Sequence, residues 1–97
     1  MITLNKLADE CLARFRHHFS IRPTAGHKIY SLMLSGEWRR MDDALDKARV
    51  EQSARQRNKY LNDAKERLAD LIVYCVGLLR LLGEKDPEQL VSRRLGK

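Results

Sequence analysis

Hydrophobic residues recur at intervals of three and four along most of this 97-residue chain, which is the spacing that places them on one face of an α-helix. Three long stretches show it, near residues 4–19, 26–48 and 60–82. No stretch alternates polar and apolar residues as a half-buried strand would. The pattern predicts an all-α fold, a small helical bundle built on a long hairpin of the second and third helices.

Each predicted helix has an apolar stripe that we expect to be buried. In the first helix the stripe consists of Leu4, Leu7, Ala8, Cys11, Leu12, Phe15 and Phe19. In the second it consists of Tyr30, Met33, Leu34, Trp38, Met41, Ala44, Leu45 and Ala48. In the third it consists of Leu61, Ala64, Leu68, Leu71, Ile72, Cys75, Leu78, Leu79 and Leu82. The two cysteines of the chain are therefore predicted to be small core residues.

The connections between these helices carry different signals. Residues 20–26 are rich in helix-breaking residues and predict a connection. Residues 49–60 are rich in Arg, Gln and Asn, and the sequence leaves open whether they form a loop or a solvated extension of a helix. Gly83 is a natural terminator of the third helix. A short fourth helix should follow, with Asp86 as its N-cap and Pro87 in its first position.

The size and composition of the chain indicate one folded domain, residues 1–97, without a membrane span. Hydrophobic residues make up 43% and charged residues 33%, which is typical of a globular helical protein. A single chain of this size has a small core, so we expect a homo-oligomer, a dimer or larger. The longest apolar run, residues 71–79, is far shorter than the roughly 20 residues of a transmembrane helix. With no signal-peptide pattern, we expect a cytoplasmic location.

The net charge of +6 favours polyanionic partners. The candidate residues for contacts with nucleic acid are Arg55, Arg57 and Lys59. No aromatic residue except Tyr60 lies among them, and this scarcity argues against stacking on single-stranded bases. A run of charges like this one also fits an ordinary solvated helix face.

Two pairs of opposite charges lie at helical spacing. Glu37 and Arg40 are three residues apart in the second helix, and Arg67 and Asp70 are three apart in the third, so each pair can meet along its helix. One interpretation is a structural cluster of ion pairs. The other is that Arg40 and Arg67 bind phosphate, because the planar donors of arginine fit phosphate oxygens bidentately.

Residues 3–10 (TLNKLADE), 68–74 (LADLIVY) and 86–91 (DPEQLV) carry a resemblance that covers nearly the whole chain. They resemble the first helix, the metal-binding helix and the closing short helix of the MazG-type all-α nucleoside triphosphate pyrophosphohydrolases. The resemblance implies a nucleotide ligand and Mg²⁺ held by carboxylates on two facing helices.

The chain departs from the metal-binding signature of that family, in which two glutamates and a third three residues later precede a Glu-x-x-Asp on the next helix. Glu37 and Asp70 stand at signature positions, whereas Gly36, Arg40 and Arg67 replace the other carboxylates. Mg²⁺ requires negatively charged oxygen ligands. The resemblance therefore implies weak or absent hydrolysis.

If the metal site is functional, the resemblance assigns Mg²⁺ as the cofactor. Its ligands would be Glu37 and Asp70, together with Glu66 from the same helix as Asp70. The register of Glu66 differs from that of the family.

Residues 22–29 (RPTAGHKI) support an alternative. They are similar to the turn that opens the second helix of Avd-type four-helix accessory proteins, which are basic, oligomeric and bind nucleic acid for reverse transcriptases. That family has a full-length fourth helix, whereas only residues 84–97 follow Gly83 here. A nucleic-acid-binding accessory role is the second hypothesis.

Overall fold

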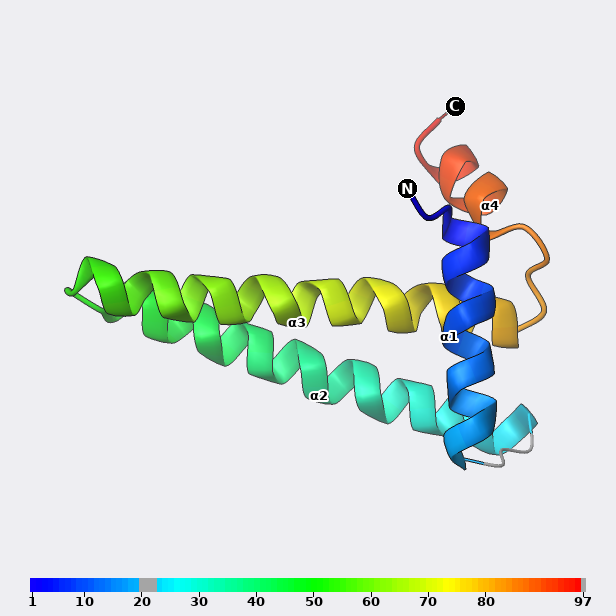
Figure 1. The fold of residues 1–97 in the computed structure, drawn as a ribbon, viewed down its shortest axis with the longest axis horizontal. Coiled ribbons are helices and arrows are strands. Elements are labelled where there is room, and N and C mark those ends of the chain that lie inside the picture. Colours follow the sequence, from blue (N-terminus) through cyan, green and yellow to red (C-terminus); the bar gives the residue numbers. More distant parts are fainter. Residues whose placement is uncertain (20–22, 97) are drawn as a thin grey trace.

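Four α-helices make up the computed structural model, which describes residues 1–19 and 23–96: α1 (Leu4–Phe19), α2 (Pro23–Val50), α3 (Ala54–Leu81) and α4 (Pro87–Arg94). Helices α2 and α3 pack side by side as a long hairpin, and α1 crosses one side of it at the end away from the turn (Figure 1). Helix α4 lies beside the first turns of α1. The predicted all-α fold with a hairpin of the second and third helices is confirmed.

The hairpin is longer than the sequence pattern predicts, with 28 residues in each helix. Helix α2 begins at Pro23 rather than near residue 26, and α3 begins at Ala54 rather than near residue 60. Proline suits the first helical position because the N–H it lacks has no partner there. The undecided segment 49–60 is therefore mostly helical, and residues 51–53 make the turn. Of the predicted connection 20–26, residues 20–22 lie outside the described part.

Three short contacts fix the hairpin turn. Ser53 caps α3, because its Oγ accepts a hydrogen bond from the backbone N–H of Gln56 at 3.3 Å. The guanidinium of Arg57 donates to the carbonyl of Glu51 through Nη2 at 2.8 Å and Nε at 3.2 Å. The Glu51 carboxylate accepts from the backbone N–H of Ser53 at 3.1 Å. A polar, arginine-rich stretch can thus form helix up to a three-residue turn.

Small side chains allow α2 and α3 to pack closely. Met41, Ala44 and Ala64 form one buried cluster between them, and Ala48 is buried as well. The core formed by the described residues is small, since its largest fully buried side chain is Pro87. The Cα radius of gyration is 15.8 Å, whereas a compact chain of this length would have about 12.5 Å. A single copy is an extended hairpin with a thin core.

Several residues predicted to be buried are exposed, so this part of the prediction is wrong. They are Trp38 (59% exposed), Leu45 (40%), Leu68 (41%), Ile72 (57%) and Leu82 (61%), and Cys75 is exposed as well. The reason is geometric, because one chain covers only the sides of the hairpin that face α1 or the opposite hairpin helix. Cys11 is buried as predicted, and it packs with Val73, Tyr74 and Leu78 of α3 among others. The predicted burial of Phe15, Phe19 and Tyr30 concerns side chains outside the described part.

The two ends of the chain are joined by polar contacts between α1 and α4. The backbone N–H of Asn5 donates to Glu88 Oε1 at 3.2 Å, and the backbone N–H of Glu88 donates to Asn5 Oδ1 at 3.1 Å. Asp86 Oδ1 caps α4 by accepting from the Gln89 N–H at 3.1 Å, and it also accepts from Asn5 Nδ2 at 3.0 Å. The predicted cap by Asp86, with Pro87 after it, is confirmed.

Arg80 fixes the path from α3 to α4. Its guanidinium donates to the carbonyls of Glu84 and Lys85 and to that of Asn5, and its Nε lies 3.0 Å from Asp9 Oδ1. Gly83 ends α3 as predicted, with a φ of 101° that favours glycine. These contacts hold α1 across the hairpin, on the side where the candidate site lies.

No helix in residues 1–19 and 23–96 has a stretch long and apolar enough to cross a lipid bilayer.

Candidate functional site

The buried carboxylate of Glu37 is the centre of the candidate site. It lies in the middle of α2, with its side chain 9% exposed. Arg40, one turn later, donates from Nη1 to Glu37 Oε1 at 3.0 Å. Arg67, on α3, reaches the other oxygen, Oε2, from Nη1 at 3.5 Å. One carboxylate thus receives two guanidinium groups from two helices, as a buried charge requires.

The predicted pair of Arg67 with Asp70 is wrong. No ion pair joins these two described residues, and Arg67 Nε instead lies 3.5 Å from Asp63 Oδ1, four residues earlier on α3. Side chains on a helix lean toward its N-terminus, so Arg67 is directed toward Asp63 and away from Asp70. The cluster is therefore formed by Glu37, Arg40, Arg67 and Asp63, and not by the predicted quartet.

Asp70 acts instead on Tyr74, one turn further along α3. Burial raises the pKa of the Tyr74 phenol, and the negative charges of Asp70 and Glu37 raise it further. The phenol therefore stays protonated at neutral pH and keeps its ability to donate a hydrogen bond. Tyr74 also packs against the cluster around Cys11, which fixes its ring beside α1.

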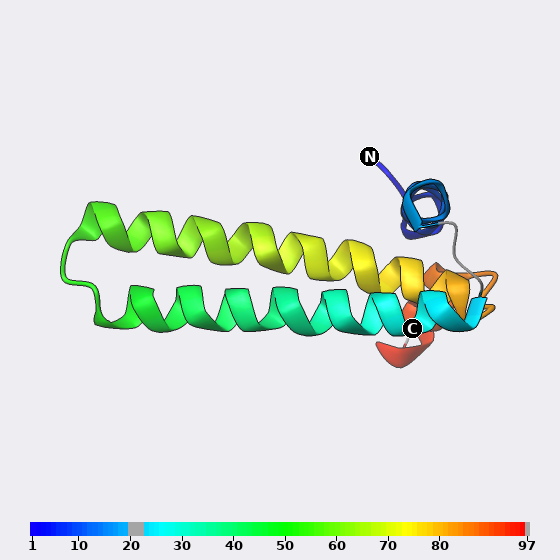
Figure 2. The ribbon, with the colours of Figure 1, turned by 90° about the horizontal axis from the view of Figure 1, so that it is seen from below.

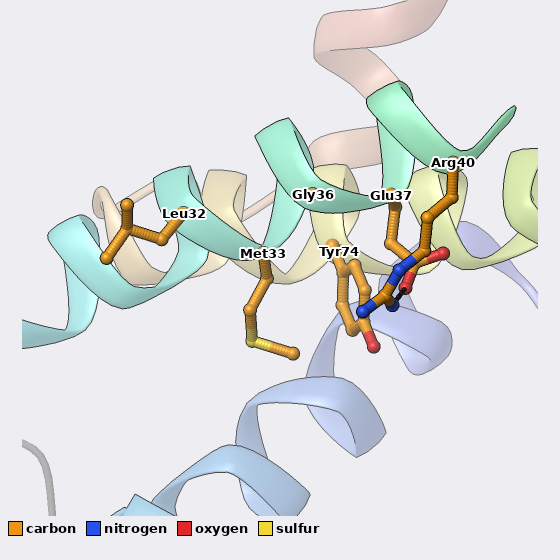
Figure 3. Close-up of a pocket in the computed structure, with 6 residues that line it drawn as sticks. All are labelled: Leu32, Met33, Gly36, Glu37, Arg40 and Tyr74. Carbon is orange, nitrogen blue, oxygen red and sulfur yellow. Dashed lines mark hydrogen bonds and ion pairs between the residues drawn. The ribbon is translucent and has the colours of Figure 1, made fainter. Parts of the chain in front are cut away.

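A pocket of about 370 Å³ opens beside this cluster. It is lined by Leu32, Met33, Gly36, Glu37, Arg40 and Tyr74. Figure 3 shows the Arg40 side chain folded back over α2 to reach Glu37, next to the Tyr74 ring. The side chain of Arg40 is 63% exposed and makes one hydrogen bond to Glu37, so most of its N–H donors face solvent or the pocket.

Gly36 leaves open space in the wall of the pocket. It lies inside α2, where a glycine destabilises a helix by roughly 0.5–1 kcal/mol relative to alanine. A Cβ atom built at this position would meet no other atom within 4 Å. Neither packing nor backbone conformation therefore requires glycine here. Its effect is to leave the α2 backbone uncovered in the wall of the pocket.

The carboxylates present do not fit a Mg²⁺ site. Among the side chains that the structure describes, no group of three or more His, Cys, Asp or Glu residues is placed to hold a metal ion. The predicted ligands Glu37, Asp70 and Glu66 thus do not come together, and Glu66 is exposed on α3. Glu37 already contacts two positive charges. We therefore assign no metal-dependent step to these residues.

The candidate nucleic-acid contacts lie at the other end of the hairpin. Arg55, Arg57 and Lys59 are exposed on the first turns of α3, next to the turn. Arg57 is engaged by the Glu51 carbonyl, which gives it a structural role. Arg55 and Lys59 form no ion pair in the described part of the chain. The tip is basic but is remote from the pocket.

Sequence analysis missed the ion pair of Asp63 with Arg67 and the contributions of Gly36 and Tyr74 to the pocket. Asp63 lies four residues before Arg67 and Tyr74 lies seven after it, so both share its helix face and helical spacing could have identified them. The open space at Gly36 had no signal in the sequence, because it depends on what lies opposite in three dimensions. The contacts of Arg80 also had no signal in the sequence, because one of them joins it to the carbonyl of Asn5, far away along the chain.

Comparisons with known proteins give no match to any protein family, to any curated protein or to any solved structure.

Proposed function

We propose that this chain is a MazG-like protein that binds a nucleoside triphosphate or a related phosphate ester with little or no hydrolysis. The observation that carries the proposal is the exposed guanidinium of Arg40 at the mouth of the pocket, held in place by buried Glu37. A guanidinium oriented by a buried carboxylate is prepared to bind phosphate oxygens without first being ordered.

The rest of the pocket supports a ligand with an apolar portion next to the phosphate. Leu32 and Met33 offer apolar surface, Tyr74 offers an aromatic ring, and Gly36 leaves space between them. Arg67 stabilises the position of Glu37 from α3, so it orients Arg40 through that carboxylate. The absence of a three-carboxylate cluster in residues 1–19 and 23–96 supports weak or absent metal-dependent hydrolysis.

Binding of ATP and the four deoxynucleoside triphosphates, measured by calorimetry with and without Mg²⁺, tests the proposal. We expect binding that persists in EDTA and that Arg40→Ala weakens by about tenfold or more, as loss of a charge-assisted contact predicts. Arg39→Ala is the matched control, because Arg39 is an exposed neighbour outside the pocket and should leave the affinity unchanged. Equal effects of the two variants would contradict the proposal.

A second variant tests the pocket without removing a charge. Gly36→Leu should fill the space beside Glu37 and weaken binding while the protein stays folded, because a Cβ there meets nothing within 4 Å. In parallel, the rate at which the wild type releases pyrophosphate with Mg²⁺ should not exceed the rate of the Glu37→Gln variant. Robust release that Glu37→Gln abolishes would show that an active metal site exists.

A nucleic-acid role at the basic tip is the second candidate, and the exposure of Arg55 and Lys59 favours it. RNA binding of this kind should weaken steeply as salt rises and should be lost in the Arg55→Ala/Lys59→Ala double variant. The short α4, of eight residues, argues against the Avd-type alternative, which has a full-length fourth helix.

We also propose that the chain forms a homo-oligomer. The described residues bury few large side chains, whereas ten large hydrophobic residues are at least 40% exposed. An isolated chain with so thin a core gains little from hydrophobic burial, and a second copy would add the missing contacts.

A further inference from the structure

The turn that joins α2 and α3 is the free end of the molecule. Figure 2 shows this turn at one end of the hairpin and the other two helices at the opposite end, as Figure 1 also does. The Ser53 cap and the contact of Arg57 with the Glu51 carbonyl hold the turn in a defined shape. It therefore presents a fixed surface that neither α1 nor α4 covers.

Positive charge is concentrated at this end of the hairpin. Residues 49–59 carry one negative side chain, Glu51, and four positive ones, because Arg49 adds to the basic tip formed by Arg55, Arg57 and Lys59. Their net charge of +3 is half of the +6 of the whole chain. No Asp or Glu occurs from residue 52 to residue 62. An ordinary solvated surface mixes the two signs of charge, so this concentration indicates an anionic partner.

The charges at this end are not neutralised within the part of the chain that the structure describes. Arg55 and Lys59 have no ion-pair partner there. Arg57 donates to a carbonyl, which is a neutral group, so its positive charge is retained. Arg49 is 76% exposed, and its Nη2 lies 3.9 Å from Asp46 Oδ1, too far for a hydrogen bond. By contrast, three arginines nearer to α1 each have a carboxylate oxygen within 3.5 Å: Arg40, Arg67 and Arg80.

The arrangement of these charges fits the phosphates of a double-stranded nucleic acid. A duplex carries one negative charge per about 1.7 Å of its axis, twice the density of one of its strands. Arg55 and Lys59 are four residues apart and share a face of α3, whereas Arg57 is turned by about 200° around the helix from Arg55. Positive charge therefore lies on both sides of α3. A duplex offers two lines of phosphates, one on each side of a groove, and a single strand offers one.

The same segment lacks what two other anionic partners would need. Residues 49–59 contain no aromatic residue on which the bases of a single strand could stack. Val50 is the only large apolar residue among them, whereas a helix that binds a membrane surface inserts a whole apolar face. Gln52 and Asn58 are exposed amides, which are donors suited to phosphate oxygens. The composition of the segment thus favours contacts with a phosphate backbone.

We infer that the basic tip binds the phosphate backbone of double-stranded nucleic acid. Arg55 and Lys59, which are exposed and unpaired in the described part, each contact a phosphate, and Arg49 and Arg57 add further contacts. This inference rests on the second candidate function and deepens it, because it names the form of the nucleic acid and the groups that are contacted. It does not depend on the ligand of the pocket, which lies away from the tip.

Fluorescence anisotropy of the full chain with labelled duplex DNA, duplex RNA and the single strands of each tests the inference. Affinity for a duplex should exceed that for its single strands by about fivefold or more at low salt. Arg55→Ala/Lys59→Ala should weaken duplex binding by about tenfold or more, and it should reduce the slope of log affinity against log salt by about 2.

Arg93→Ala/Arg94→Ala is the matched control for this double variant. It removes the same charge from exposed residues at the end of α4, far from the tip, and should leave duplex affinity within about twofold. All four substitutions are at exposed helical positions where alanine favours helix, so both variants should fold. Melting of each variant beside the wild type checks this.

The outcomes separate the inference from the second candidate function. Binding of either duplex that depends on Arg55 and Lys59 supports the inference, and the tighter duplex identifies the polymer. Single strands that bind as tightly as the duplex, through the same two residues, would overturn the inference alone. No binding of nucleic acid, or equal losses in the tip variant and its control, would overturn both. Binding to vesicles of anionic lipid in place of nucleic acid, lost in the tip variant, would also overturn both and identify a membrane surface as the partner.

Discussion

The two sides of the α2–α3 hairpin differ in what covers their apolar residues. On the covered side, α1 packs through Cys11 against Val73 and Tyr74, and a buried carboxylate is held by two arginines. On the bare side, Trp38 and Ile72 are more than half exposed. Helical spacing alone makes the two sides look alike, because both carry apolar residues at intervals of three and four. Burial depends on whether another helix is present.

The largest expected effect contrasts Met41 with Trp38. Met41→Ala should lower the free energy of unfolding by about 2–4 kcal/mol, because Met41 is 4% exposed between α2 and α3. Trp38→Ala removes a larger side chain but should cost less than about 1 kcal/mol in the single chain, because Trp38 is 59% exposed. Urea unfolding of both variants at low protein concentration gives the two values.

A reversal of this order would contradict the distinction between the two sides. Repeating the Trp38→Ala measurement at high protein concentration sharpens the distinction, because the proposed self-association is then favoured. In the paired protein, the cost of Trp38→Ala should rise and should depend on protein concentration, since unfolding is then linked to dissociation.

The next largest effect concerns the ion pairs of the covered side. Arg67→Ala should lower the free energy of unfolding by about 1–2 kcal/mol, because Glu37 keeps Arg40 but loses its second partner. In a double-mutant cycle, Arg67 and Glu37 should couple by roughly 0.5–1.5 kcal/mol. In the corresponding cycle, Arg67 and Asp70 should couple by less than about 0.5 kcal/mol. Strong coupling between Arg67 and Asp70 would instead support the ion pair that the sequence predicted.

A smaller effect, of opposite sign, is expected at Gly36. Gly36→Ala should raise the free energy of unfolding by about 0.5–1 kcal/mol, because alanine favours helix and its Cβ meets nothing in the pocket. Gly83→Ala is the internal control and should destabilise, since Gly83 has a φ of 101°. Thermal melting of both variants shows the two signs, and a destabilising Gly36→Ala would mean that the pocket is narrower than described.

The smallest effect is a pH dependence at the contact that holds α1 in place. The hydrogen bond from Asn5, and then the one from the Gln89 N–H, lower the pKa of Asp86 below its ordinary value of 3.8. The contribution of this carboxylate to the free energy of unfolding is therefore fully present above its ordinary pKa. It is lost as pH falls through the lowered pKa that the carboxylate has in the folded state. Asp86→Asn should melt below the wild type at neutral pH, and the difference should shrink in acid. A difference that stays constant with pH would rule out this linkage.

The sequence predicted the helices better than their lengths. Spacing of apolar residues identified the hairpin, and Gly83 and Asp86 were read correctly as a terminator and a cap. The sequence left open whether the first turns of α3 are helix or loop, because this stretch has few apolar residues. The contact of Arg57 with the Glu51 carbonyl, and the Ser53 cap, stabilise that polar stretch locally.

The candidate site was only partly predictable. The pair of Glu37 and Arg40 follows from spacing within one helix, and the approach of Arg67 follows from the antiparallel packing of α2 and α3. The choice of Asp63 over Asp70 depends on the direction in which a long side chain leans along its helix. The pocket beside Gly36 is lined by side chains of both α2 and α3, so it depends on how the two helices pack, which spacing within one helix does not encode.

The contact between α1 and α4 has a consequence for how the chain folds and opens. It joins Asn5 to Glu88, residues separated by 83 positions, whereas the hairpin helices meet across a turn of residues 51–53. Closing the longer loop costs more chain entropy, so the hairpin can form before the ends of the chain find each other. The same ends can separate while the hairpin remains intact. Transient release of α1 would then uncover the Cys11-facing side of α3, so the packing around Val73 and Tyr74 depends on contacts made near the two chain termini.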